Sequence, residues 1–489
     1  MKAENSNKVQ KGVKVFLPFY LFTSLLFFVA VFLFFGLAYP HHLHYQEQYQ
    51  LFLFDSTYVW EIVKQPGGVA DLLGRFCTQF FLFAWVGAAI VALLFSAVQL
   101  LTLCLFRNHE GWTYGLSFVP SFLLWFFLLD ENALLSGVWA VLISLFIAWV
   151  IVKLTKGWVR RILLIVAIPV LYILVGPVCF PIPIDSLWLG IHYYRYPTVF
   201  PWLLWAAAFS AFVIVGMVLL IRHRLKYSSY LLPFPSKARR PVAFLTSYLL
   251  VAIVMGVLVW KNANFKAEKV MQYDFMACHQ QWNRILETVN TEKPNNQIGV
   301  TVQNLALAMR GMLLEHMFDY NQNSIHGLLP DVKEDATSPL PTAEAFYQLG
   351  MINVAQRTVF EAQEAILDFQ KSGRCYKRLA QTNLINGQYE VARKYLTALQ
   401  KTLFYRDWAN ETLPLLGNEK AIASHPEYGR LRQCAYNEDF YFSDHVTPEM
   451  LEGLYYRNTD NRLAYQYLLA YCMLTGDRER YNHIISKAQ

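Results

Sequence analysis

Residues 40–74 contain four carboxylates within one short polar stretch: Glu47, Asp55, Glu61 and Asp71. Grouped carboxylates can supply general acid–base catalysis, so this grouping raises an enzyme hypothesis. Residues 45–60 also mix aromatic residues with Gln, Glu and Asp, which predicts a helix at a membrane interface with its carboxylates toward water. Solvated acidic side chains are the alternative interpretation, and they are the commoner case.

Three histidines at the start of the same stretch, His41, His42 and His44, could suggest a metal site. Zinc needs three or four ligands that converge from matching directions. Histidines spaced by one and two residues supply only part of such a set. We therefore expect interfacial histidines and no metal site, and the sequence points to no particular cofactor.

Four of the seven cysteines lie beyond residue 260: Cys278, Cys375, Cys434 and Cys472. The chain contains no Cys-x-x-Cys pair, which argues against a thioredoxin-type site and against a zinc ribbon. Four cysteines allow three fully paired connectivities. Buried free thiols are the other interpretation, and the sequence does not choose between the two.

The elements that must position these residues are seven apolar runs within residues 15–260. Each run is free of charged residues and long enough to cross roughly 30 Å of hydrocarbon as a helix. A water-soluble core does not need such lengths in series, so the sequence predicts a polytopic membrane protein. The runs are 15–39, 76–106, 112–129, 133–152, 162–180, 199–221 and 241–260.

Lys and Arg concentrate in alternate gaps between the runs. Fifteen lie in the leader and in every second gap, whereas the other gaps hold only Lys64, Arg75 and Arg195. Basic residues near span ends resist translocation, so the richer side is predicted to be cytoplasmic. Residues 1–14 are then a cytoplasmic leader. The loops 40–74 and 181–198 lie outside, and an odd number of spans places residues 261–489 outside as well.

The net charge is unevenly divided along the chain. Residues 1–260 contain 18 Lys and Arg against 9 Asp and Glu, and residues 261–489 contain 24 against 26. The overall charge of +7 is therefore a topology signal, and we expect no nucleic-acid partner. The runs themselves lack the ionisable groups that ion-coupled transporters usually carry at mid-membrane depth.

From residue 261 onward, apolar residues recur at intervals of three and four, which predicts a helical domain. Gly350, Gly387 and Gly476 are each followed five residues later by a packing residue, as in helix–turn–helix repeats. Residues 378–399 resemble a tetratricopeptide unit, although the repeat is degenerate. A tetratricopeptide-like superhelix that binds a peptide or protein is predicted, with an irregular helical bundle as the alternative.

The chain resembles an uncharacterised group of Bacteroidota membrane proteins that carry a helical-repeat tail. The resemblance depends on EQYQLFLF at 47–54, PGG at 66–68, QFF at 79–81 and LAYQYLLAYCMLTGD at 463–477. The resemblance covers most of the chain. It implies a membrane topology but no particular activity. It implies the bacterial inner membrane, with the amino terminus in the cytoplasm and the carboxy-terminal domain in the periplasm.

In outline the chain is also similar to C-type glycosyltransferases, which use lipid-linked sugars. This similarity implies that Glu47 or Asp55 would assist the acceptor nucleophile or a metal, and that Arg195 would bind the lipid phosphate. The chain departs from that pattern, because no Asp-x-Asp or Asp-Glu pair follows the first run. A shared outline does not establish shared chemistry.

We therefore expect an all-α protein, with a seven-helix transmembrane bundle over 15–260 and an extracytoplasmic tetratricopeptide-like domain over 261–489. The favoured function is a membrane-anchored scaffold in envelope assembly or maturation. Its partners would be the bilayer and a protein or peptide bound by residues 261–489. The alternative is a C-type-like glycosyltransferase with a lipid-linked sugar donor, and its catalytic residues would be Glu47, Asp55 and Arg195.

Overall fold

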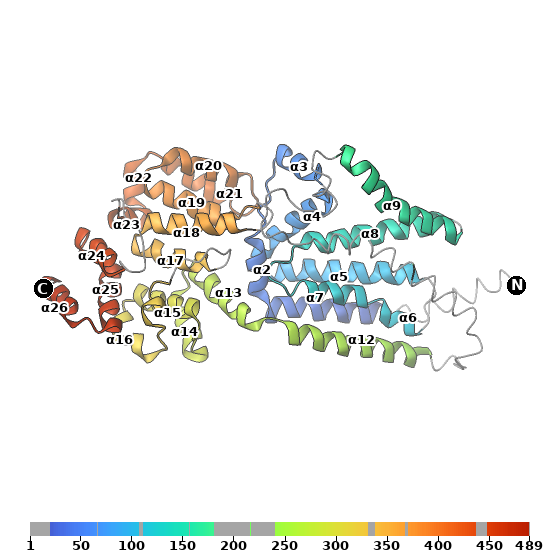
Figure 1. The fold of residues 1–489 in the computed structure, drawn as a ribbon, viewed down its shortest axis with the longest axis horizontal. Helices are drawn as coiled ribbons and strands as arrows, with labels where there is room; N and C mark the ends of the chain where they lie inside the picture. Colours follow the sequence, from blue (N-terminus) through green and yellow to red (C-terminus); the bar gives the residue numbers. More distant parts are fainter. Residues whose placement is uncertain are drawn as a thin grey trace. The chain divides into compact units, whose positions relative to one another are not determined.

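The computed structural model describes residues 20–65, 67–106, 111–155, 157–179, 216, 240–330, 338–366, 370–436 and 447–488. Every regular element in these residues is a helix, as the sequence predicts (Figure 1). The chain divides into two compact units. Unit 1 comprises Met1–Glu47 and Ser56–Phe265, and unit 2 comprises Gln48–Asp55 and Lys266–Gln489.

Unit 1 contains four described helices that are long and apolar enough to cross a membrane: Tyr20–Ala38, α5 (Ala84–Phe106), α8 (Leu135–Leu154) and Leu245–Asn262 within α12 (Arg240–Asn262). They coincide with the first, second, fourth and seventh predicted runs. Helix α9 (Trp158–Cys179) covers the fifth run. The sixth run lies outside the described residues apart from Gly216, so the count of seven spans remains a prediction.

The second and third runs are not single continuous helices. The start of the second run is occupied by the end of α4 (Gly68–Thr78) and by the 3-10 turn η2 (Gln79–Leu82). The third run forms two short helices, α6 (Gly111–Leu116) and α7 (Val119–Phe127). Pro120 lies in the first turn of α7, where its missing N–H costs no helical hydrogen bond.

Aromatic rings and small residues pack the helices of unit 1. Phe27 meets Phe118 and Phe122 edge to face, with ring centroids 5.4 and 5.1 Å apart. A Cβ added to Gly74 would lie 2.7 Å from the backbone nitrogen of Ser136, so α4 and α8 approach as closely as a glycine permits. Close backbone approach of this kind is how helices associate in lipid, where apolar side chains gain little from mutual burial.

The prediction of one interfacial helix over 45–60 is wrong for the middle of that range. Helix α2 (Pro40–Glu47) ends before it and α3 (Ser56–Val63) begins after it, while residues 48–55 form no helix. Leu51 and Leu53 instead pack against one apolar cluster of unit 2. Alternate residues turned to the same side are typical of an extended chain, and tertiary packing therefore overrides the helical pattern here.

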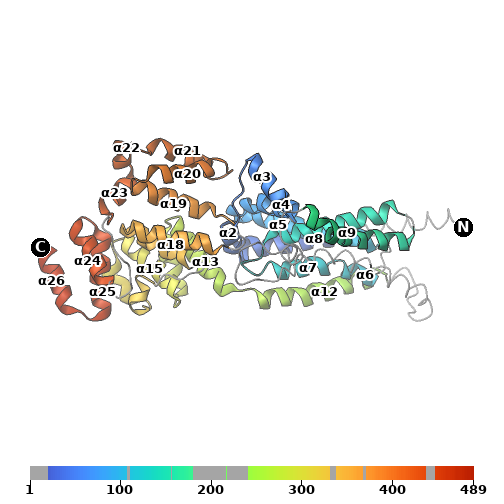
Figure 2. The same ribbon diagram turned by 45° about the horizontal axis from the view of Figure 1, so that its top comes forward.

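The regular elements of unit 2 are short helices (Figures 1 and 2). The helices are α13 (Phe265–Cys278), α14 (Trp282–Glu292), α15 (Gln297–Met309), α16 (Leu313–His316), α17 (Pro339–Leu349), α18 (Ile352–Ala365), α19 (Gly373–Ile385), α20 (Tyr389–Gln400), α21 (Arg406–Thr412), α22 (Glu419–Ser424), α23 (Pro426–Cys434), α24 (Thr447–Arg457), α25 (Arg462–Thr475) and α26 (Arg478–Ala488).

The three glycines expected at turns each end the first helix of a hairpin. Gly350 joins α17 to α18, Gly387 joins α19 to α20 and Gly476 joins α25 to α26, with φ of 95°, 75° and 73°. A residue with a side chain pays roughly 1–2 kcal/mol in this left-handed region, which is why glycine is used. The predicted helix–turn–helix positions are therefore confirmed.

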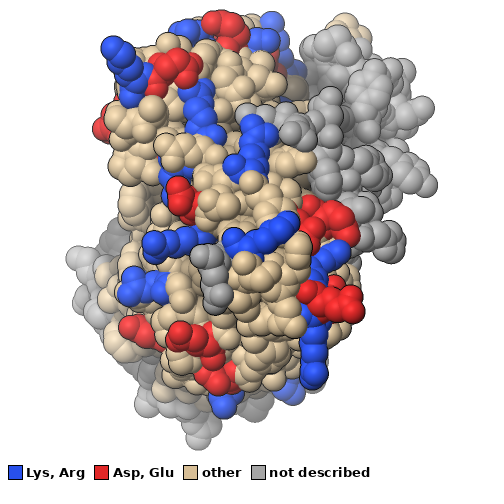
Figure 3. Space-filling model, turned by 90° about the vertical axis from the view of Figure 1, so that its left-hand side faces the viewer, with Lys and Arg blue, Asp and Glu red and all other residues tan. Residues whose placement is uncertain are grey.

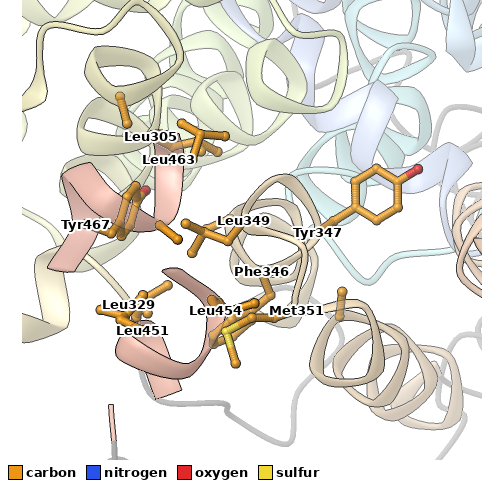
Figure 4. Packing of buried hydrophobic residues seen from close by; sticks show 14 of the residues in the cluster. Leu305, Leu329, Phe346, Tyr347, Leu349, Met351, Leu451, Leu454, Leu463 and Tyr467 are labelled. Atoms are coloured by element: carbon orange, nitrogen blue, oxygen red, sulfur yellow. The ribbon is translucent and has the colours of Figure 1, made fainter. Parts of the chain in front are cut away.

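The largest apolar core of unit 2 joins helices that are far apart in the sequence (Figure 4). Phe346 and Leu349 of α17 are buried together with residues of α15, α24 and α25: Leu305, Leu451, Leu454 and Tyr467. Figure 4 shows Tyr347 directed away from these residues, although it lies on the same helix. Tyr347 is itself a buried member of this cluster, and its hydroxyl makes polar contacts elsewhere.

The four cysteines of unit 2 form no disulfide. Cys278, Cys375, Cys434 and Cys472 are free thiols, and the last three are buried. The structure therefore agrees with the free-thiol interpretation. Burial raises the pKa of the Cys472 thiol to about 11, which keeps it protonated and unreactive at neutral pH.

Candidate binding site

Helix α19 carries a row of polar side chains along one face. They occupy positions i, i+3, i+4 and i+7: Arg374, Lys377, Arg378 and Gln381. Another side of the helix is apolar, with Cys375 and Leu379 buried in a small cluster. We refer to the side chains of Asp274, Glu344, Tyr347, Arg374, Lys377 and Arg378 as the charged cluster.

Arg374 joins α19 to α13 through a two-pronged ion pair. Its Nη1 lies 2.5 Å from Oδ2 of Asp274, and its Nη2 lies 2.8 Å from Oδ1. Only 11% of the arginine side chain and 12% of the aspartate side chain are exposed. Burial alone would lower the pKa of Arg374, but the Asp274 carboxylate raises it well above the usual value. The Arg374 guanidinium therefore stays protonated.

Arg378 joins α19 to α17 in two ways. Its Nη2 donates to Oε2 of Glu344 at 2.5 Å, and its guanidinium carbon lies 3.6 Å from the ring centroid of Tyr347. Its Nη1 is buried and has no hydrogen-bond partner among the described residues. A buried donor without a partner is uncommon in native structures, and it leaves one hydrogen bond available to a ligand or to water.

Helix α23 closes the network from another side. The hydroxyl of Tyr347 donates to Oε1 of Glu427 at 2.9 Å, and burial raises the pKa of Tyr347, so the phenol remains a donor. Arg430 donates to the side-chain and backbone oxygens of Gln348 at 2.8 and 3.1 Å. Helix α19 is thus bonded to α13 through Arg374 and to α17 through Arg378, and α17 is bonded to α23.

Lys377 differs from its neighbours because no described carboxylate forms an ion pair with it. Its Nζ lies 5.0 Å from the ring centroid of Trp408 on α21, a cation–π contact. Burial is the main cause that lowers the pKa of Lys377, and the adjacent Arg378 acts in the same direction. A negative charge brought next to the Lys377 ammonium would therefore stabilise its charged form.

The cluster and its rim have one cation more than they have carboxylates. Four cations, Arg374, Lys377, Arg378 and Arg430, meet three carboxylates, Asp274, Glu344 and Glu427. Among the described residues, neither Lys377 nor Arg430 forms an ion pair with a carboxylate: Arg430 bonds Gln348, and Lys377 lies beside the indole of Trp408. A carboxylate next to an apolar or aromatic group is the chemistry that this arrangement can recognise, since charge-assisted bonds and ring contacts would form together.

The structure describes two of the three predicted catalytic residues, and these two belong to different units. Glu47 is the last residue of α2, with a buried side chain, and it belongs to unit 1. Asp55 belongs to unit 2 and forms an ion pair with Lys401. Arg195 lies outside the described residues. The catalytic roles proposed for these three residues remain predictions.

Two of the three histidines of α2 contact each other, and the third packs elsewhere. Nδ1 of His41 lies 3.3 Å from Nδ1 of His44, while the ring of His42 is buried against Tyr39 with centroids 4.7 Å apart. In the part of the chain that the structure describes, no group of three or more His, Cys, Asp or Glu residues could hold a metal ion.

The charged cluster was not identified from the sequence, although a local signal exists. Arg374, Lys377 and Arg378 are spaced as neighbours on a helix face, and so are Glu344 and Tyr347. Charged residues at this spacing usually form a solvated face. Nothing in the sequence says that Asp274, a hundred positions before Arg374, will meet it.

Comparison with known proteins gives one match that spans both units. The model of DUF6057, described as a family of unknown function, matches residues 16–487. No curated protein and no solved structure matches the chain.

Proposed function

This chain belongs to the DUF6057 family of unknown function, and we propose that it is a membrane protein whose unit 2 binds a protein or peptide partner. Four helices of unit 1 have the length and the composition needed to cross a membrane. Unit 2 provides the binding surface. The single observation that carries the proposal is the cation of Lys377, which is partly buried beside Trp408 and has no carboxylate partner among the described residues.

Unit 2 is proposed to be a tetratricopeptide-like array. Helices α17 and α19 are the first helices of successive hairpins, and each contributes side chains to the charged cluster. Helix α13 precedes them and contributes Asp274. In stacked helical repeats, the first helices of successive units form the surface that holds a ligand. The shared network between α13, α17 and α19 supports that geometry.

The proposed ligand is a peptide segment that carries a carboxylate next to an apolar or aromatic side chain. The carboxylate would bind Lys377, next to the guanidinium of Arg378, and the neighbouring side chain would contact Trp408. Figure 3 shows basic and acidic side chains interspersed over one face of the molecule. Specificity for an acidic segment would therefore come from this local pair of cations, and long-range steering would contribute little.

The proposed location is the bacterial inner membrane, with unit 2 in the periplasm. The clustering of basic residues in alternate gaps supports a cytoplasmic amino terminus. A second argument comes from the two separate chain segments that make up unit 2. Because Gln48–Asp55 and Lys266–Gln489 form one compact unit, the chain between them must cross a membrane an even number of times. Six crossings, as the sequence predicts, satisfy this condition.

The glycosyltransferase alternative has less support. Asp55, one of its two candidate carboxylates, is paired with Lys401, and that pairing would have to open before Asp55 could act on a substrate. The other, Glu47, lies in unit 1, and no described metal-ligand cluster accompanies it. The scaffold proposal, in contrast, uses side chains that the structure already brings together.

A peptide selection tests the proposed function. The full chain in lipid nanodiscs is screened against a display library of random peptides, and enriched peptides are then measured individually. We expect enriched peptides to contain Asp or Glu beside an apolar residue, and Lys377→Glu to weaken their binding at least tenfold, about 1.4 kcal/mol. Lys394→Glu, at an exposed position of α20, is the matched control. Equal binding by the two variants, or no acidic enrichment, would refute the proposal.

A further inference from the structure

Residues 48–55 leave unit 1 and lie on the hairpin formed by α19 and α20. The backbone N–H of Leu51 donates to the carbonyl of Lys371 at 2.7 Å, and that of Phe54 donates to the carbonyl of Lys401 at 2.6 Å. Lys371 precedes α19, and Lys401 is the C-cap of α20. The carbonyls at a helix end have no partner within the helix, so the segment satisfies a group that would otherwise need another donor.

The side chains of the segment alternate between two environments. Leu51 is buried in one apolar cluster with residues of the hairpin and of α21, and Leu53 packs against the same cluster: Ala380, Leu396, Leu399 and Ala409. Phe52 and Phe54 instead contact each other, with ring centroids 5.1 Å apart. This alternation is that of an extended peptide bound along a surface.

The segment ends with a charge that the hairpin neutralises. Asp55 accepts a hydrogen bond from Nζ of Lys401, the residue whose carbonyl receives the N–H of Phe54. Lys401 thus binds both the backbone of the segment, at Phe54, and its last side chain, that of Asp55. Two backbone bonds, two apolar side chains and one ion pair together define a recognition site for an extended segment with the pattern Leu-x-Leu-x-Asp.

We propose that α19, α20 and α21 form a peptide-binding site whose ligand is residues 48–55 of the same chain. The chain supplies this ligand from a loop that lies between α2 and α3 of unit 1. Without it, the cluster around Ala380 and Leu399 loses Leu51, and the carbonyl of Lys401 loses its donor. The fold of this part of unit 2 therefore depends on the loop, which must be on the same side of the membrane.

The proposal can fail or hold separately from the function proposed for the charged cluster, although Trp408 also packs against the apolar cluster that holds Leu51. It concerns the surface that holds Leu51 and needs no external partner. A peptide-binding site also differs from ordinary core packing in a testable way. A separate copy of the peptide can fill such a site when the tethered segment does not. A tethered segment has an effective concentration near the millimolar range, so a free peptide at about 1 mM can replace a segment that no longer binds.

Hydrogen exchange of the full chain in nanodiscs tests the proposal. In Leu51→Asp, exchange in 389–412 should rise at least tenfold, while α24–α26 keep their protection and show that the unit remains folded. Adding the peptide QYQLFLFD at about 1 mM should restore protection to 389–412, and a scrambled peptide should not. Unchanged exchange in Leu51→Asp, or no difference between the two peptides, would overturn the proposal.

A second pair of variants decides the matter if Leu51→Asp does not fold. The Phe54 side chain is 46% exposed, so Phe54→Ala should leave exchange in 389–412 unchanged. Phe54→Pro removes the same ring and also the N–H that bonds Lys401. We expect only the proline variant to raise exchange, again with rescue by the peptide. Equal exchange in both variants would contradict a role for the backbone bond.

Discussion

Asp55 and Lys401 are 346 positions apart in the chain and form an ion pair, in which Nζ of the lysine donates to Oδ2 of the aspartate. The side chains are 22% and 45% exposed, so water screens part of their attraction. The pair defines the end of the segment that unit 2 receives from the loop. Asp55, which the sequence analysis considers as a catalytic carboxylate, therefore forms an ion pair within unit 2.

Exchanging the two charges tests this pairing. Asp55→Lys and Lys401→Asp should each lower the free energy of unfolding by about 0.5–1 kcal/mol, because each places like charges side by side. The double variant restores an opposite pair and should recover most of the loss. Thermal unfolding of the detergent-solubilised chain at low salt measures the three differences. Simple additivity of the two losses would show that the residues do not interact.

The helical hairpins of unit 2 could be predicted because their signals are local. Gly350, Gly387 and Gly476 each stand where a helix must stop and the backbone must turn with positive φ. The turn at Gln280, with φ of 54°, has no glycine and is correspondingly harder to recognise. Helix and turn are decided within a few residues, so a single sequence contains the information.

Long-range pairing could not be predicted from the sequence. Residues 48–55 have the composition of an amphipathic helix, and only the contact of Leu51 with unit 2 explains why they are extended. The partners within the charged cluster are equally remote in the chain, as Asp274 and Arg374 show. Local propensity is a weak guide where packing from a distant segment decides the conformation.

The buried pair of Asp274 and Arg374 should be sensitive to loss of one partner. Arg374→Met leaves the carboxylate buried without a counter-charge and should destabilise unit 2 by about 3 kcal/mol. Replacing both residues, with Asp274→Leu and Arg374→Met, removes both charges and should recover much of that loss. Chemical denaturation in detergent, followed by circular dichroism, measures each variant.

An exposed pair serves as the control for this prediction. Arg357 and Glu361 lie one helical turn apart on α18, and 57% of the arginine side chain is exposed. Arg357→Met should therefore cost no more than about 0.5 kcal/mol. Equal losses for Arg357→Met and Arg374→Met would show that burial of the Asp274 pair has no special consequence.

Two turn glycines provide a matched comparison of backbone strain and steric fit. Gly350→Ala and Gly476→Ala both place a side chain at positive φ, at a cost of roughly 1–2 kcal/mol. Only at Gly350 would the new Cβ lie 2.7 Å from the carbonyl oxygen of Cys434, whereas nothing lies within 4 Å at Gly476. Gly350→Ala should therefore lower the melting temperature clearly more than Gly476→Ala, and equal shifts would exclude the steric contribution.

His42 should make the stability of unit 1 depend on pH. Its ring is fully buried, and burial lowers its pKa to about 4, although a hydrogen bond with the backbone of Leu128 acts in the opposite direction. An unfolded histidine binds a proton near pH 6.5. The unfolded state thus gains the proton first as the pH falls. The stabilisation is complete above about pH 6.5 and is lost progressively down to about pH 4.

The size of this effect follows from the difference between the two pKa values. Between pH 7.5 and 5.5 the free energy of unfolding should fall by about 1 kcal/mol because of His42 alone. His42→Gln removes the titrating group and should unfold with a correspondingly smaller pH dependence. His44→Gln is the control, because His44 lies on the same helix and is only partly buried. Thermal melts of the three proteins at the two pH values decide the point. An identical pH dependence in wild type and His42→Gln would show that the buried ring does not resist protonation.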